Sequence, residues 1–102
     1  MRVPYVMMHS LSGTILSSVQ RNGYSLAYYG VRLWEDAPVP AQMAEALAEA
    51  GFAPGEAGGE LDEWEPLALS EHDAKMANVK LRNDPNRVVA YRDGAIVAKR
   101  NE

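Results

Sequence analysis

The alternation of apolar and polar positions is clearest near the C-terminus, in the segment RVVAYRDGAIVAKR. Two runs rich in β-branched residues flank the dipeptide Asp93-Gly94. Asp-Gly accepts the positive φ angles of a type I′ turn, whose twist matches that of two paired strands. The pattern therefore predicts a β-hairpin in which residues 87–92 pair with residues 95–99.

A helical period precedes this hairpin in the segment SEHDAKMANVKLRNDP. Ser70 fits the N-cap position, and acids in the first turn with bases in the last turn complement the helix dipole. The predicted inward stripe consists of Ala74, Ala77 and Leu81. Because Pro85 disfavours helical geometry in the residue before it, we expect this helix to end near Arg82.

The segment PVPAQMAEALAEAGF predicts an earlier helix. Pro40 suits the first turn, Ala, Met, Leu and Glu fill the body, and Gly51 suits the left-handed position of a Schellman motif. In that motif Phe52 contacts Leu47. We expect the Ala-rich stripe to pack against the body of the same domain. Residues 53–65, rich in Gly, Ala and acids, should then form a mobile loop.

The segment MHSLSGTILSSVQRNGY, residues 8–24, is compatible with two structures. Apolar residues at 11, 15 and 19 recur at helical spacing, which favours a helix that ends at Gly23. Its β-branched residues and the dipeptide Asn22-Gly23 are typical instead of one arm of a hairpin. We take the helix as the first interpretation and keep the hairpin as the alternative.

The next segment, YSLAYYGVRLW, has the composition of a strand. Alternation puts two sets of side chains on opposite faces. One face carries Tyr29, Val31 and Leu33, and the other carries Tyr28, Arg32 and Trp34. If the second face is uncovered, it forms an aromatic patch of the kind that binds proteins, whereas under the middle helix it would be core.

The predicted order is strand, helix, strand, helix, loop, helix and hairpin. It indicates an α+β fold with one mixed or antiparallel sheet, two or three helices and a C-terminal β-hairpin. A chain of 102 residues allows a single small domain over 1–102. Its large apolar side chains are few, with one Phe and two Trp, so we expect ordinary or marginal stability.

Charge is distributed unevenly around a net value of −4. Between Arg32 and Lys75 there are eleven acids and no Lys or Arg, whereas bases predominate from Lys75 onward. An acidic middle argues against general nucleic-acid binding, because phosphate contacts need clustered bases. It suits a protein partner with a basic surface, and a solvated acidic face is the plain alternative.

Several classes of chemistry are not indicated. The chain has no cysteine, which excludes disulfides and thiolate sites and fits a cytoplasmic protein. No segment approaches the ~20 apolar residues of a membrane span, and no targeting segment is recognisable, so we expect a soluble protein. His9 and His72 fall in different predicted elements, which predicts no metal site. No catalytic set is recognisable, and we expect a non-enzymatic protein.

Trp64 stands alone among acids and would either anchor the acidic loop on the body or insert into a partner. The predicted protein-binding residues combine this acidic segment with the Tyr/Trp strand. They are Tyr28, Arg32, Trp34, Glu60, Asp62, Glu63, Trp64 and Glu65.

Residues 5–50 carry a pattern that begins at His9, continues through an apolar run to Gly23-Tyr24, and ends in GVRLWEDAP. This pattern resembles the front half of small ADP-ribosyltransferase-like proteins, whereas the C-terminal half is unmatched. The resemblance implies that His9 hydrogen-bonds the nicotinamide ribose of NAD and that Tyr24, Tyr28 or Tyr29 stacks on the nicotinamide ring. The plain interpretation of His9 is a half-buried ring at the end of the first strand, hydrogen-bonded to backbone.

Two functional hypotheses follow. The first is a non-enzymatic protein-binding or inhibitory module, of the kind encoded by phages or accessory loci, which needs no cofactor and uses the acidic middle and the Tyr/Trp strand. The second is a reduced ADP-ribosyltransferase-like domain that binds NAD, active or vestigial. Association with a second copy of the chain is compatible with either.

Overall fold

The computed structural model describes residues 3–21, 23–24, 26–53, 55–56 and 58–100. It has the predicted α+β class, with six short strands and two α-helices among the described residues. The elements in chain order are β1 (Tyr5–His9), β2 (Ser17–Arg21), β3 (Ala27–Val31), α1 (Pro40–Glu49), the 3₁₀ turn η1 (Leu61–Glu63), β4 (Trp64–Ala68), α2 (Glu71–Leu81), β5 (Arg87–Arg92) and β6 (Ala95–Arg100).

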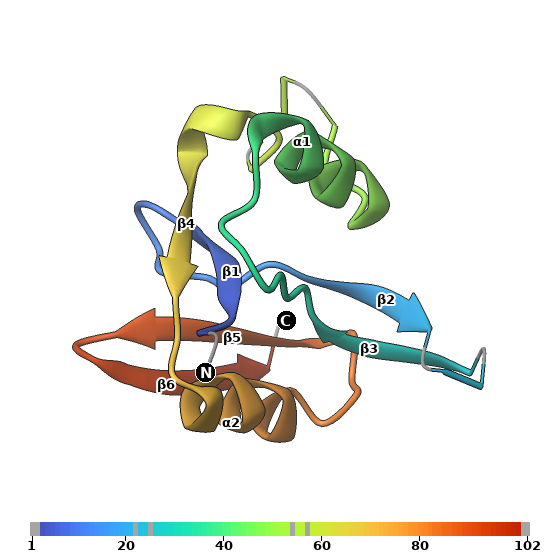
Figure 1. Ribbon diagram of the computed structural model, residues 1–102, viewed down its shortest axis with the longest axis vertical. Helices are drawn as coiled ribbons and strands as arrows, with labels where there is room; N and C mark the ends of the chain where they lie inside the picture. The colour runs from blue at the N-terminus through green and yellow to red at the C-terminus, as the bar shows by residue number, and fades with distance from the viewer. Residues whose placement is uncertain (1–2, 22, 25, 54, 57, 101–102) are drawn as a thin grey trace.

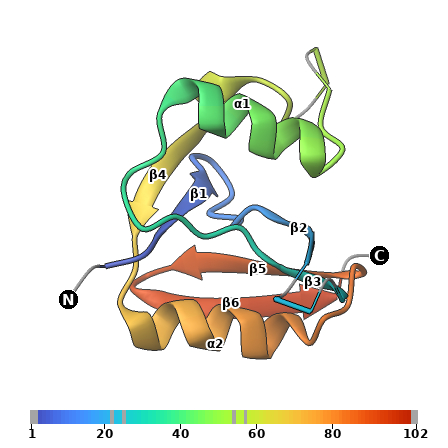
Figure 2. The ribbon, with the colours of Figure 1, turned by 45° about the vertical axis from the view of Figure 1, so that its right-hand side comes forward.

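Strand β1 lies in the middle of the molecule and is buried on both faces. Val6 and Met7 are both 0% exposed, and they belong to different apolar clusters. Val6 packs with α2 and the β5–β6 hairpin, whereas Met7 packs with α1 and Trp64. Figure 2 shows the resulting arrangement, with α1 and α2 on opposite sides of the strands.

The strands form three separate two-stranded antiparallel sheets, β1–β4, β2–β3 and β5–β6, so the prediction of one sheet is wrong. Single bridges connect them, at Met8–Ile15, Thr14–Ala90 and Tyr5–Trp34. The segment before β2 is held on both sides, since the Ile15 N–H donates to Val89 and the Leu16 N–H donates to Met7. Each contact lasts only one residue because two-stranded ribbons twist strongly and diverge.

The first interpretation of residues 8–24, a helix that ends at Gly23, is also wrong, and the alternative of a hairpin arm is confirmed, because Ser17–Arg21 is a strand paired with β3. The helical spacing of residues 11, 15 and 19 does not mark a buried face. Ile15 is 2% exposed, but Leu11 is 94% and Val19 is 66% exposed. Gly13 adopts a φ of 78°, which interrupts a helix at its start. Asn22, in the alternative turn, lies outside the described residues.

Helix α1 ends as its sequence predicts. The Phe52 N–H donates to the Leu47 carbonyl at 3.0 Å and the Gly51 N–H donates to the Ala48 carbonyl at 3.1 Å, with Gly51 at a φ of 88°. This pair of hydrogen bonds is a Schellman motif. The buried stripe of α1 contains Met43, Ala46 and Leu47.

Helix α2 and the C-terminal hairpin also match their predictions. The Ser70 hydroxyl accepts a hydrogen bond from the Asp73 N–H at 3.0 Å, and the helix ends where Arg82 turns left-handed. Its predicted stripe, Ala74, Ala77 and Leu81, is buried. Asp93 and Gly94 have φ angles of 52° and 78°, as a type I′ turn requires.

Strand β4 is absent from the sequence prediction, which extended an acidic loop to residue 65. The chain instead becomes a strand at Trp64, because β1 supplies an antiparallel partner in which His9 lies opposite Trp64. Within the described part of the chain, neither α-helix has the length and apolar character needed to cross a membrane.

Candidate functional site

Trp64 anchors the acidic loop on the body of the domain. It is 6% exposed, and its indole N–H donates to the Gly58 carbonyl at 2.7 Å. The rings of His9 and Phe52 meet it edge-on, with centroids 5.2 Å and 5.7 Å away. Of the two roles considered for Trp64, the geometry matches the anchor.

Two of the four acids assigned to a partner hold the loop in shape. The Glu63 carboxylate accepts hydrogen bonds from the N–H groups of Gly58 at 3.0 Å and Glu60 at 3.2 Å. The Glu60 carboxylate accepts from the Gly55 N–H at 2.7 Å. Asp62 and Glu65 are exposed, as is Glu60 despite its hydrogen bond, whereas Glu63 is half-buried. The negative charge available to a partner therefore comes first from these exposed acids.

His9 lies at the end of β1, with both ring nitrogens close to polar groups. Its Nδ1 accepts from the Ser12 N–H at 3.4 Å, and its Nε2 lies 3.7 Å from a carboxylate oxygen of Glu63. The Ser12 hydroxyl donates to Thr14 rather than to the imidazole. A nucleophile needs a base within hydrogen-bond reach, so this arrangement lacks the pairing of a serine hydrolase.

The three tyrosines of the NAD hypothesis lie in different surroundings. Tyr24 is 87% exposed, beyond the end of β2. Tyr28 and Tyr29 are neighbours in β3 and project to opposite faces of the strand. Tyr29 is half-buried, and this burial raises the pKa of its phenol above the ordinary value.

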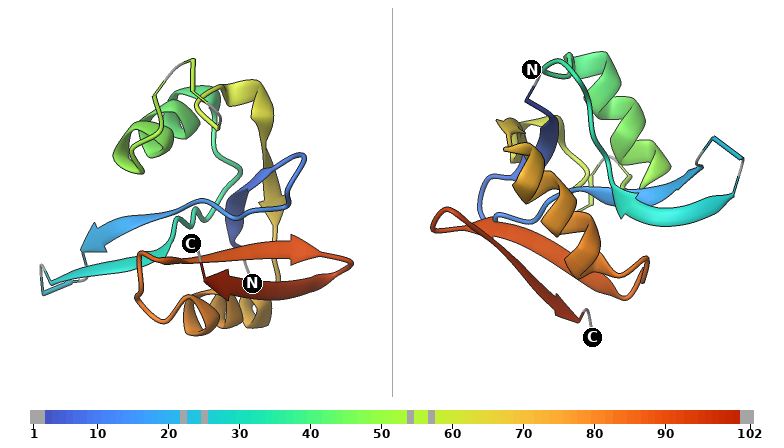
Figure 3. Two further views of the ribbon diagram at one scale, coloured as in Figure 1. Left: turned by 180° about the vertical axis from the view of Figure 1, so that it is seen from behind. Right: turned by 60° about the horizontal axis from the view of Figure 1, so that its bottom comes forward.

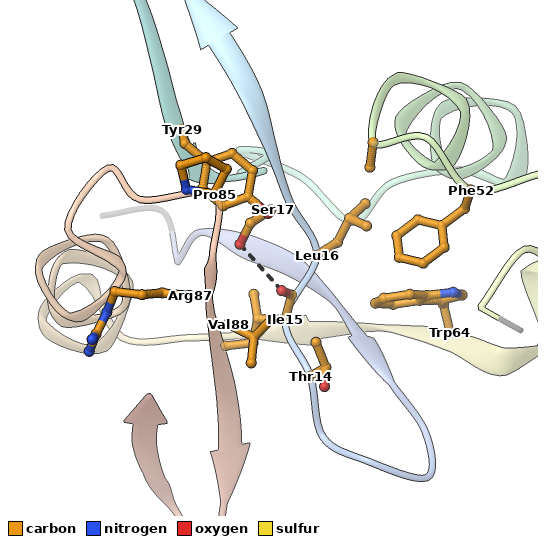
Figure 4. Close-up of a pocket in the computed structure, with 11 residues that line it drawn as sticks. Thr14, Ile15, Leu16, Ser17, Tyr29, Phe52, Trp64, Pro85, Arg87 and Val88 are labelled. Atoms are coloured by element: carbon orange, nitrogen blue, oxygen red, sulfur yellow. Dashed lines mark hydrogen bonds between the residues drawn. The ribbon is translucent and has the colours of Figure 1, made fainter. Parts of the chain in front are cut away.

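His9 and Tyr29 line two different hollows, which have three lining residues in common. One, of about 240 Å³, is lined by His9, Ser12 and Gly58 together with a shared wall of Thr14, Phe52 and Trp64. The other, of about 150 Å³, uses the same wall and also includes Tyr29 and Arg87. Figure 4 shows Phe52 and Trp64 on one side of the chain from Thr14 to Ser17, with Pro85, Arg87 and Val88 on the other. The sequence gives no indication of this wall, because its residues come from distant segments.

A third hollow, of about 350 Å³, surrounds Trp34. Pro4, Leu33 and Trp34 form the apolar part of its lining, and the acidic residues Glu35 and Glu71 complete it. We refer to these five residues as the Trp34 hollow. Reciprocal backbone hydrogen bonds between Tyr5 and Trp34, at 2.8 and 3.0 Å, fix its position.

Trp34 combines the two roles that the sequence left open. It is half-buried and packs against the apolar cluster beneath α1, yet it also lines the hollow. The guanidinium carbon of Arg32 lies 5.1 Å from its ring centroid, a cation–π distance. Nε of Arg32 is buried without a hydrogen-bond partner among the described residues. The tryptophan that lines the hollow therefore already makes a cation–π contact with Arg32 of the same chain.

The layer formed by α1 and the loop after it, here called the acidic layer, has exposed acids and no base among its described residues, whereas the layer of α2 and the β5–β6 hairpin has exposed bases together with the acids Glu71 and Asp93. The exposed acids of α1 and the following loop are Glu45, Glu49, Glu56, Glu60 and Asp62. The exposed bases of α2, its C-terminal end and the β5–β6 hairpin are Lys75, Arg82, Arg92, Lys99 and Arg100. Figure 1 shows α1 and α2 at opposite ends of the fold. The charge separation along the sequence thus becomes a separation in space.

Comparison of the chain with protein-family models, with curated proteins and with solved structures gives no match. Among the described residues, no group of three or more His, Cys, Asp or Glu side chains is arranged to hold a metal ion. The features of the molecule that bear on function are therefore its hollows, its exposed side chains and its charge distribution.

Proposed function

We propose that the chain is a non-enzymatic protein-binding module and that the Trp34 hollow receives a basic segment of its partner. The observation that carries the proposal is the combination, in the lining of one hollow, of apolar residues around Trp34 with the acidic residues Glu35 and Glu71. A Lys or Arg side chain has the same two-part chemistry, because its methylene stem is apolar and its head is charged.

The residue types of this hollow favour binding energy concentrated in a few contacts. Tryptophan, which the hollow supplies as Trp34, is enriched among the residues that dominate protein interfaces, especially in partly enclosed positions. Trp34 is held by the backbone of β1 on one side and packed under α1 on the other. A partner would therefore meet a preorganised ring and lose little affinity to ordering it.

The acidic layer supports the same proposal at longer range. Glu45 and Glu49 on α1 and Asp62 on η1 are exposed and lie in a part of the chain that is without bases. Such a field attracts a basic surface and raises the association rate, with an effect that falls as salt screens it. We propose that contacts in the Trp34 hollow determine the affinity for the partner and that the acidic layer raises the rate of association.

The test begins with a phage-displayed library of peptides, selected on the protein without a known partner. Lys- or Arg-containing peptides with neighbouring apolar residues should be enriched. Their affinity is then measured by fluorescence anisotropy against Leu33→Ser and the pair Glu35→Gln with Glu71→Gln. Each variant should weaken binding about tenfold or more, since one lost buried contact is worth roughly 1.4 kcal/mol or more.

The matched control is the pair Glu45→Gln with Glu49→Gln on α1, which removes the same charge outside the Trp34 hollow. It should lower the association rate at low salt and leave the dissociation rate unchanged. Selection of only acidic or uncharged peptides, or basic binders that tolerate every change in the hollow, would contradict the proposal.

The rival hypothesis, an NAD-binding domain, is tested separately. His9 occupies the end of β1, as the resemblance implies, but Tyr24 and Tyr28 do not line the hollow that contains His9. This distribution favours the protein-binding module. Titration with NAD, followed by tryptophan fluorescence, should give no saturable change. Saturable binding that His9→Ala abolishes would replace the proposal with the rival.

A further inference from the structure

The β2–β3 hairpin projects from the body as an arm, visible in Figure 1 and in both views of Figure 3. Between residues 10 and 31 only Arg21 carries a charge. Several of the arm's large apolar side chains are exposed, with Val19 at 66%, Leu26 at 63% and Tyr28 at 37%. An isolated two-stranded hairpin is marginally stable in water, so an arm of this composition calls for a covering partner.

The two edges of the arm differ. On the β3 edge, the Val31 N–H donates to the side-chain oxygen of Asn78 at 2.9 Å, and the Tyr29 N–H donates to that of Asn83. Both N–H groups therefore point away from β2 and are already bound. Side chains from α2 and its C-terminal end block this edge against a further strand.

The β2 edge is open. Ser17 lies opposite Val31 and Val19 lies opposite Tyr29. Directly opposed residues of an antiparallel pair either bond each other or both point outward, so the N–H and C=O groups of Ser17 and Val19 point outward. In the described part of the chain these groups have no hydrogen-bond partner. Natural edge strands are usually protected by charged side chains, Pro or a bulge, and in the sequence SSVQR of β2 the only charged residue is Arg21 at its end and Pro is absent.

We propose that β2 pairs antiparallel with β2 of a second copy of this chain, about a two-fold axis at Val19. Such strand addition satisfies backbone groups on both copies and joins the two arms into one continuous sheet. Val19 lies opposite Val19 of the second copy and exchanges both backbone hydrogen bonds with it. Ser17 of each copy lies opposite Arg21 of the other.

We favour a second copy as the partner of β2 because pairing two identical arms brings no like charges together. In this register the two Arg21 residues lie at opposite ends of the pairing, about four residues or roughly 14 Å apart. That separation exceeds the screening length of about 8 Å at physiological salt. No other charge lies on the arm, so the pairing places no like charges opposite each other. The basic partner proposed for the Trp34 hollow would find no negative charge on the arm, whose only charged residue is Arg21.

The register is tested with single cysteines, because the chain has none of its own. Val19→Cys places two thiols directly opposite, where the Cα separation of about 5.5 Å is within disulfide range. With oxidised glutathione, most of this variant should become a covalent dimer. The matched control, Ser17→Cys, puts its two thiols at opposite ends of the pairing, too far apart for a disulfide. This variant should therefore form no covalent dimer.

Reversible association is tested by sedimentation equilibrium over a range of protein concentrations. The unmodified chain should form dimers, and Val19→Pro should weaken dimerisation at least tenfold, because proline lacks the outward N–H but leaves the β2–β3 hydrogen bonds intact. Val19→Thr, which keeps that N–H and the branched side chain, should still form dimers.

Circular dichroism and the unfolding midpoint establish that each variant is folded. A monomer at all concentrations up to about 1 mM, equal cross-linking of both cysteine variants, or a dimer unaffected by Val19→Pro would each overturn the proposal. A monomeric chain whose β2 edge instead captures another protein's strand would also overturn the assignment to a second copy. These outcomes leave the proposal for the Trp34 hollow untouched, since no hollow residue is changed.

Discussion

The two hairpins of this fold are similar in local structure and different in their surroundings. The β5–β6 hairpin lies against α2, and Val89 and Ile96 are buried at 0% and 7% exposure beneath it. The β2–β3 hairpin is buried only at its root, where Val31 joins the same cluster, and its outer part is exposed. A turn sequence therefore determines where the chain reverses, whereas a covering element determines whether the hairpin becomes part of the core.

The largest expected effect comes from weakening the cover of the β5–β6 hairpin. Leu81 is 0% exposed and lies at the C-terminal end of α2, in the cluster with Val89. Leu81→Ala should lower the free energy of unfolding by about 2–5 kcal/mol, since a buried leucine leaves both lost contacts and a cavity. Urea unfolding measures the loss. A change below 1 kcal/mol would show that α2 does not stabilise this hairpin.

A smaller effect is expected where the arm joins the body. Asn78→Ala leaves the Val31 N–H without its acceptor and should cost about 1–3 kcal/mol. Hydrogen exchange at Val31 should accelerate together with this loss. Asn86→Ala, which changes an exposed side chain, should stay within about 0.5 kcal/mol of the unmodified chain. Equal effects of the two substitutions would rule out a specific contribution from the Asn78 hydrogen bond.

The glycines of the two connections provide a direct comparison. Gly94 has a φ of 78° and no neighbouring atom within 4 Å of an added Cβ, so Gly94→Ala tests the backbone conformation alone. It should cost about 1–2 kcal/mol, the penalty of a left-handed alanine. Gly23 has open space and no positive φ, so Gly23→Ala should be neutral or stabilising by up to about 1 kcal/mol. Thermal unfolding of both variants checks the contrast.

The smallest effect is expected on the exposed part of the arm. Leu26→Ser should change the free energy of unfolding by less than about 0.5 kcal/mol at a protein concentration where the chain is monomeric. Ile96→Ser, a matched change on the covered hairpin, should cost several times more. If Leu26→Ser proved equally costly in the monomer, the arm would have a cover of its own.

The elements that the sequence predicted are those with complete local information. Ser70, Gly51 and Asp93-Gly94 each act within a few residues of the element that they begin or end. For strand β2 the local pattern left a helix and a hairpin arm open, because the pairing with β3 and the bridges to β1 and β5 that decide between them involve distant residues. The helical spacing that favoured a helix there reflected one buried residue, Ile15.

The candidate sites divide in the same way. Trp34 could be singled out from the aromatic strand, but Pro4 and Glu71 reach its hollow from distant segments. Glu63 holds the loop through the nearby Gly58 N–H, and the β1–β4 pairing brings His9 beside its carboxylate from a distant segment. Side-chain type therefore indicated which residues suit an interface, whereas tertiary pairing decided which of them were free to form one.

Strand β1 has a consequence for how the chain melts. Adjacent residues of this single strand, Val6 and Met7, enter separate apolar clusters. Disordering either cluster would remove the strand on which the other depends. We therefore expect one calorimetric transition, with equal van't Hoff and calorimetric enthalpies, in a protein whose sheets are discontinuous.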